Sequence, residues 1–233
     1  MRFEAAVGSE TGNRYAANFD VAHLRTDPLL AVVADGMGDS PGSALAGRAT
    51  VDTVVAGLVG EITPRLIRKV VAQTQERVTE IGRQDVGLAG CTLTALAGDE
   101  NGLWVVQVGD SRVYRLRGRL LELLTVDHTM AWLGAGHGWY PFDSAEARAA
   151  RYQLTRYVGH PGRPEADVLN ILPATGDVYL LCTDGIAEQV EYAGIANALA
   201  TRPPEQAVRE LLAAADAAGG HDNATAIVIS AEP

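Results

Sequence analysis

The sequence predicts an α+β fold in a single domain that covers residues 1–233. Three observations predict it. Short apolar runs rich in valine, isoleucine and leucine end on Gly or Asp, which is typical of buried strands. Longer stretches with helical character lie between groups of these runs. Hydrophobic residues make up 47% of the chain and charged residues 21%, as expected for a globular domain with a sizeable core.

The strands follow from apolar runs that are bounded by turn residues. The clearest is the unbroken run 29–34, and the pair Gly118-Arg119 predicts a tight hairpin between two later strands. Two strands around a turn at 10–13 are expected within 2–25. The others are expected at 29–34, 91–98, 103–109, 111–117, 120–124, 167–172, 178–183 and 224–230.

The first two helices have the strongest signals. Ser40 is a suitable cap and Pro41 a suitable first residue for a helix that extends to about Val59. The next helix carries its apolar residues on one face, so this pair is expected to cover one face of a sheet. The remaining helices are expected at about 64–83, 144–151, 151–158, 192–201 and 204–217.

The segment 127–150 shows neither a strand pattern nor a helix pattern over most of its length, and it contains three glycines, a proline and four aromatic residues. An irregular segment of this kind is either a mobile functional loop or a small cluster packed on the core, and the sequence leaves both interpretations open.

Composition excludes several classes of function. The net charge of −10, with Lys69 as the only lysine, argues against a nucleic-acid-binding surface. No apolar run is long enough to span a bilayer and the start lacks a secretory signal, so we expect a cytoplasmic protein without a membrane partner. Cys91 and Cys182 lie within strand patterns and are expected to be reduced core residues.

Carboxylates recur at the ends of the predicted strands. Asp35, Asp110 and Asp184 each follow an apolar run, and Asp222 precedes the last one. An Asp-Gly pair after a strand is often just a turn. Four such ends, however, would meet at one edge of antiparallel strands, where the carboxylates repel one another unless cations lie between them. An all-oxygen cluster suits Mg²⁺ or Mn²⁺ rather than zinc.

Five motifs in order resemble the PPM-type (type 2C) metal-dependent protein phosphatases, bacterial branch. The motifs are Asp35-Gly36-Met37-Gly38, Gly90-Cys91-Thr92-Leu93, Val108-Gly109-Asp110-Ser111-Arg112, Leu180-Leu181-Cys182-Thr183-Asp184-Gly185 and Asp222-Asn223-Ala224-Thr225. The resemblance covers about 8–229. It implies a four-layer α-β-β-α sandwich of two antiparallel sheets flanked by helix pairs, with a flap segment at about 127–158.

The resemblance also implies a metal centre. Asp35 would bridge two Mn²⁺ or Mg²⁺ ions, and the Gly36 carbonyl would bind one of them. Asp184 and Asp222 would hold the other ion, and Asp110 would belong to a third, looser site. In this family a hydroxide bound to the ions attacks the phosphorus of phosphoserine or phosphothreonine.

Two features of the chain depart from the family pattern. The family carries Glu-Asp where this chain has Phe19-Asp20, although Asp20 would still orient water at the ions. The family's phosphate-binding Arg falls at Tyr15. Arg14 lies one position away, and on a strand it would face the opposite side unless a bulge intervenes. The animal members have a candidate general-acid His at a place where this chain has Met37, as bacterial members commonly do.

Three hypotheses follow. The leading one is a protein serine/threonine phosphatase, a monomer whose partner is a phosphorylated protein made by a Ser/Thr kinase. Phe19 and the displaced Arg14 favour a second, a weakly active or inactive module that binds phosphoproteins. A third is a small-molecule phosphomonoesterase with the segment 132–142 choosing the substrate. His221 is expected to be structural, because the family pattern needs only the neighbouring Asp.

Overall fold

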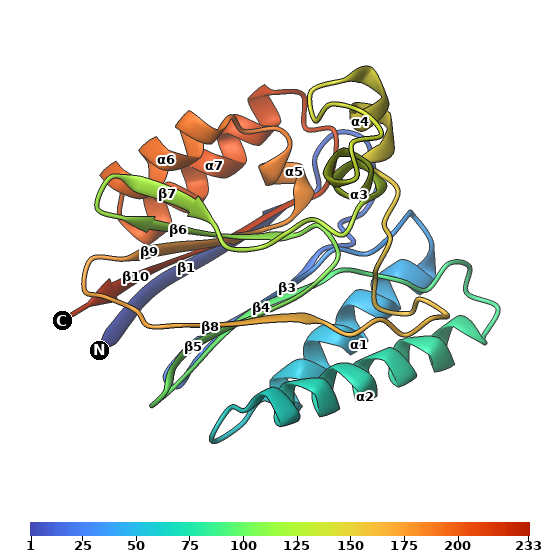
Figure 1. The fold of residues 1–233 in the computed structure, drawn as a ribbon, viewed down its shortest axis with the longest axis horizontal. Coiled ribbons are helices and arrows are strands. Elements are labelled where there is room, and N and C mark those ends of the chain that lie inside the picture. The colour runs from blue at the N-terminus through green and yellow to red at the C-terminus, as the bar shows by residue number, and fades with distance from the viewer.

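The strands form two antiparallel sheets that pack face to face, and a pair of helices covers the outer face of each (Figure 1). The computed structural model describes residues 1–233. One sheet has the order β1 (Arg2–Glu10), β10 (Ala224–Glu232), β9 (Val178–Cys182), β6 (Arg112–Arg117), β7 (Leu120–Leu123). The other has the order β2 (Val21–Thr26), β3 (Leu29–Ala34), β4 (Leu93–Asp99), β5 (Gly102–Val108), β8 (Asp167–Ile171). This is the four-layer sandwich that the resemblance implied.

Strand β3 shows why its run of apolar residues is continuous. Every residue of β3 is buried, because one side faces the other sheet and the opposite side faces helices. Leu29, Ala31 and Val33 belong to the core between the sheets, whereas Leu30 and Val32 pack towards the helices. The unbroken apolar run therefore reflects the burial of both faces of β3.

Helices α1 (Pro41–Gly57) and α2 (Pro64–Gly82) cover the second sheet and begin as predicted (Figure 1). The Ser40 hydroxyl accepts a hydrogen bond from the backbone N of Ser43 at 3.3 Å. The apolar face of α2 supplies Ile67, Val70 and Val78 to the helix-side core. Each helix ends within two residues of its predicted end, α1 at Gly57 and α2 at Gly82.

Helices α6 (Tyr192–Thr201) and α7 (Pro204–Ala217) cover the first sheet and have the predicted bounds. Three short helices lie at one end of the molecule, away from both chain termini (Figure 1). They are α3 (Met130–Gly136), α4 (Ala145–Ala150) and α5 (Asp184–Ala187). No helix is both long and apolar enough to cross a membrane.

Two expectations for this end of the molecule were wrong. The predicted helix at 151–158 is instead an irregular stretch in which Leu154 and Val158 form isolated bridges with Thr129 and Cys91. These tertiary pairings replace the local helix. The segment 127–150, expected to be irregular, contains α3. The two cysteines are buried and free, as expected.

Candidate metal centre

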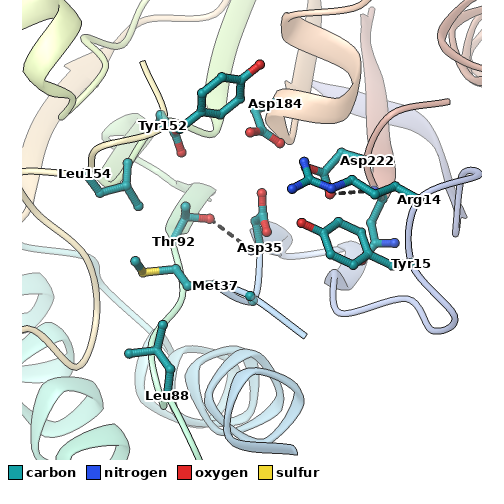
Figure 2. Close-up of a pocket in the computed structure, with 14 residues that line it drawn as sticks. Arg14, Tyr15, Asp35, Met37, Leu88, Thr92, Tyr152, Leu154, Asp184 and Asp222 are labelled. Carbon is teal, nitrogen blue, oxygen red and sulfur yellow. Dashed lines mark hydrogen bonds between the residues drawn. The ribbon is translucent and has the colours of Figure 1, made fainter. Parts of the chain in front are cut away.

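The four predicted carboxylates lie at the same end of the two sheets and line one cavity of about 560 Å³. Figure 2 labels three of them, Asp35, Asp184 and Asp222. Asp35 follows β3 and Asp110 follows β5, both in the second sheet. Asp184 follows β9, and Asp222 precedes β10, both in the first sheet. The four carboxylates line one cavity as predicted, but they come from two packed sheets rather than from one sheet edge.

Asp35 is held by its own backbone, which leaves its carboxylate free. Its backbone N donates to the Thr92 hydroxyl at 2.9 Å, and its carbonyl accepts from the backbone N of Thr92 at 2.8 Å. Gly36 also lines the cavity. A Cβ at this position would lie 2.9 Å from the carbonyl oxygens of Phe19 and Ser43, so only glycine fits the turn.

Asp184 and Asp222 are brought together by a close approach of backbone segments. A Cβ at Gly185 would lie 2.0 Å from the carbonyl oxygen of Asn223, which explains the glycine after Asp184. Asp222 Oδ1 accepts a hydrogen bond from the backbone N of Asn223 at 2.8 Å. Asp184 Oδ1 is buried and has no hydrogen-bond partner in the protein.

The electrostatics of the cavity are those of crowded carboxylates. Burial and then the charges of Asp20 and Asp184 raise the pKa of Asp35 well above its ordinary value. Burial, followed by Asp110 and Asp222, does the same for the pKa of Asp184. The pKa of Asp110 is raised to about 7, first by burial and then by Asp127 and Glu188.

Divalent cations fit this donor set. Arg14 is the only cationic side chain among the residues that line the cavity, so the protein does not neutralise the four carboxylates. Although the four carboxylates line the same cavity, no three His, Cys, Asp or Glu side chains are placed to hold an ion by themselves, so other ligands such as a backbone carbonyl would be needed. The buried, unpartnered oxygen of Asp184 and the purely oxygen-based lining suit hard ions such as Mg²⁺ or Mn²⁺.

Asp20 lies behind this cluster and is not among the residues that line the cavity. Its Oδ2 accepts hydrogen bonds from the hydroxyls of Thr183 at 2.9 Å and Thr225 at 2.7 Å. Its Oδ1 is buried without a partner. Burial raises the pKa of Asp20 to about 6, against the opposing effect of the two threonine hydroxyls.

Arg14 reaches the cavity because residues 11–20 form a loop rather than a strand. The expected alternation of side chains therefore does not apply, and the neighbouring Tyr15 lines the cavity as well. The Arg14 guanidinium carbon lies 5.0 Å from the centroid of the Tyr15 ring. Burial and then the charge of Asp222 raise the pKa of Tyr15.

Asn223 was not predicted as a site residue, although it lies within a quoted motif. Its Oδ1 accepts from the backbone N of Phe19 at 2.8 Å. Its Nδ2 donates to the carbonyls of Thr11 at 2.7 Å and Ala17 at 3.2 Å. Asn223 thus fastens the loop that carries Arg14 to the start of β10.

The segment 127–158 borders the other side of the cavity, to which it contributes Tyr152 and Leu154. The backbone N of Met130 donates to the carbonyl of Gln153 at 2.8 Å, which closes the base of the segment. Trp132 and Phe142 are exposed and contact each other, with ring centroids 5.2 Å apart. His221 is exposed and does not line the cavity.

The chain is similar to known phosphatases along nearly its whole length. A family model described as Protein phosphatase 2C matches residues 17–225. The serine/threonine protein phosphatase PstP of Mycobacterium tuberculosis is 30% identical over 92% of this chain, which spans only 44% of the length of PstP. The crystal structure of the PPM Ser-Thr phosphatase MsPP from Mycobacterium smegmatis is 33% identical, with a TM-score of 0.86 and 98% of each chain covered. A structure of the PstP catalytic domain in complex with two manganese ions is 25% identical, with a TM-score of 0.87, and covers 100% of this chain and 99% of that one.

Proposed function

Because the chain belongs to the protein phosphatase 2C family, we propose that it is a metal-dependent protein serine/threonine phosphatase. The observation that carries the proposal is the cluster of half-buried carboxylates, which Arg14, the one cation that lines the cavity, offsets only in part. Such a cluster is costly to keep ionised unless it binds cations. The manganese ions in the related PstP structure support the same interpretation.

The cavity supports a role for each carboxylate that the family pattern assigns. Asp35 would contact two Mn²⁺ or Mg²⁺ ions, with the Gly36 carbonyl on one ion and with Asp184 and Asp222 on the other. Asp110 would serve a third ion. When bound, such ions supply Lewis acidity that makes hydroxide available near neutral pH and neutralises charge on the phosphoryl group.

Other residues in and behind the cavity would bind the substrate and orient water. Arg14, as the only cation that lines the cavity, would hold the phosphoryl group of the substrate. Asp20 would act from behind, where its fixed Oδ2 leaves the unpartnered Oδ1 to orient water. Met37 lines the cavity and has no acidic proton, so no side chain at that position would protonate the leaving oxygen.

We further propose that residues 1–233 act as one catalytic domain and that the segment 127–158 is its flap. Tyr152 and Leu154 support this role, because both line the cavity. The substrate would be a protein phosphorylated by a Ser/Thr kinase. A cytoplasmic location and a monomeric state remain predictions.

Phe19 favours one alternative, a module that binds phosphoproteins with little turnover. A carboxylate at this position would add a further oxygen ligand near Asp20, and its absence is expected to weaken metal binding. The alternative and the main proposal differ in turnover, which a simple assay measures.

The test is hydrolysis of p-nitrophenyl phosphate by the purified chain with Mn²⁺ and with EDTA. We expect turnover only with Mn²⁺, and at least ~100-fold less in the Asp35→Asn and Asp184→Asn variants. Full activity in either variant would refute the proposed site. Phosphopeptide binding without turnover by the unmodified chain would instead favour the binding module, and a panel of phosphopeptides and small phosphoesters would separate a protein phosphatase from a phosphomonoesterase.

A further inference from the structure

The loop 11–20 brings two neighbouring side chains, Arg14 and Tyr15, into the carboxylate-lined cavity (Figure 2). The four carboxylates cannot hydrogen-bond a negatively charged phosphoryl group while they are ionised, because they are then acceptors only. Any protein donors to that group must therefore come from other residues that line the cavity.

Most of the other polar side chains that line the cavity already make hydrogen bonds within the protein. The Thr92 hydroxyl accepts from the backbone N of Asp35 at 2.9 Å and pairs with the Ser111 hydroxyl at 2.8 Å. The side-chain amide of Asn223 is fully used by the loop 11–20. Figure 2 shows the Tyr152 hydroxyl pointing away from Asp35, whereas the Tyr15 hydroxyl points towards it.

Arg14 and Tyr15 are also arranged as a unit. The Arg14 guanidinium carbon lies 5.0 Å from the Tyr15 ring centroid, within the range of a cation–π contact. The ring of Phe19 meets that of Tyr15 edge-on, with centroids 6.2 Å apart and planes at 88°. Phe19 itself is fixed by the hydrogen bond from its backbone N to Asn223. Phe19 thus supports Tyr15, and Tyr15 supports Arg14.

We propose that Tyr15 is a phosphoryl-binding residue of this chain. Its hydroxyl donates a hydrogen bond to a non-bridging oxygen of the phosphoryl group, and its ring is the platform that directs the Arg14 guanidinium to the same group. The hydroxyl keeps its proton throughout, and no bond to phosphorus forms. Phe19 occupies the place of a family carboxylate and gains a role as the support of this ring. The inference rests on the proposed function, because it needs a phosphoryl group in the cavity.

The test compares the Tyr15→Phe and Tyr15→Leu variants of the full, Mn²⁺-loaded chain. Calorimetric titration with inorganic phosphate measures binding without turnover. Tyr15→Phe keeps the ring and is expected to bind phosphate about tenfold more weakly, the loss of one hydrogen bond to a charged group. Tyr15→Leu also removes the platform and is expected to lose a further ~3-fold. Tyr192→Phe, on α6 and outside the cavity, is the matched control and should bind as the unmodified chain does.

Kinetics on two substrates identify the oxygen that Tyr15 contacts. Because non-bridging oxygens are common to both, Tyr15→Phe should lower kcat/KM equally for p-nitrophenyl phosphate and for a phosphothreonine peptide. A loss confined to the peptide, whose leaving group is the poorer one, would place the hydroxyl on the leaving oxygen and overturn the assignment.

Unchanged phosphate binding by Tyr15→Phe, with metal content equal to that of the unmodified chain, would also overturn it. Failure of the unmodified chain itself to bind phosphate and to turn over either substrate would refute the proposed function, and this inference with it.

Discussion

Asp110 provides a quantitative test of the crowded carboxylates. The substitution Asp110→Asn should stabilise the metal-free protein above neutral pH, although it removes a candidate metal ligand. In the folded chain the pKa of Asp110 rises from 3.8 to about 7, because burial and the charges of Asp127 and Glu188 disfavour its ionised form. Folding must therefore ionise this group against its surroundings at pH 8. Asparagine has nearly the same shape without the charge.

The size of the effect follows from linkage. A carboxyl whose pKa is raised by folding binds more protons in the folded state, so the free energy of unfolding falls as the pH rises from about 4 to about 7. One pKa unit is worth about 1.4 kcal/mol, so a rise from 3.8 to about 7 corresponds to about 4 kcal/mol. At pH 8 we expect Asp110→Asn to recover most of this free energy of unfolding. For a chain of this size, that corresponds to a rise in Tm of about 10 °C. Near pH 4 the two proteins should melt together.

The assay is thermal and urea denaturation in EDTA at several pH values, with Asp177→Asn as the matched control of opposite sign. Asp177 is a buried carboxylate with partners, since it accepts from Arg117 Nε at 2.7 Å and from the Tyr179 hydroxyl at 2.8 Å. Its burial alone would raise its pKa, but these hydrogen bonds outweigh burial and lower it. Arg117 is partly exposed and stays solvated when the carboxylate is removed, so the loss of these charged hydrogen bonds should cost about 1.5–3 kcal/mol near neutral pH. If Asp110→Asn also destabilises the metal-free chain at pH 8, the carboxylates of the cavity are neutralised by the protein itself.

Three further predictions concern the same site. Mn²⁺ at 100 times its Kd should raise the free energy of unfolding by about 2.7 kcal/mol. The rise in Tm should be larger at pH 8 than at pH 5, because protons compete with the metal for the carboxylates. An equal rise in Tm at both pH values would contradict this prediction. Asn223→Ala removes three hydrogen bonds to the loop 11–20. It should lower the free energy of unfolding by about 3 kcal/mol in urea titrations and should also lower kcat/KM. A variant with the same stability and the same kcat/KM as the unmodified chain would contradict this prediction. His221→Ala should keep most of the Mn²⁺-dependent turnover, since the side chain is exposed and outside the cavity, and a loss of more than ~10-fold would show that it acts in the reaction.

The sequence predicted those parts of the fold whose signals are local. The run Leu29–Ala34 is apolar because it is buried on both faces, and its end at Asp35 was therefore visible. The Ser40-Pro41 pair marked the start of α1 for a similar reason, because capping involves only a few neighbouring residues. The four carboxylates were identified because each one adjoins a strand end.

The features that the sequence did not predict depend on distant contacts or on very short elements. Helix α5 has four residues, too few for an apolar period to be recognised. The stretch 151–158 has helical character, but bridges from Leu154 to Thr129 and from Val158 to Cys91 hold it in another conformation. Tyr15 was noted only as a departure from the family pattern, because its approach to the cavity depends on the loop that Asn223 fastens.

The most direct test of the proposed metal centre is the location of manganese in crystals of this chain, measured by anomalous diffraction at the manganese edge. We expect two strong peaks in the cavity, both beside Asp35, with Gly36 next to one and Asp184 and Asp222 next to the other. Crystals grown with Mn²⁺ that show no peak among these residues, or that show the Arg14 guanidinium paired with Asp35 and Asp184 in place of an ion, would contradict it.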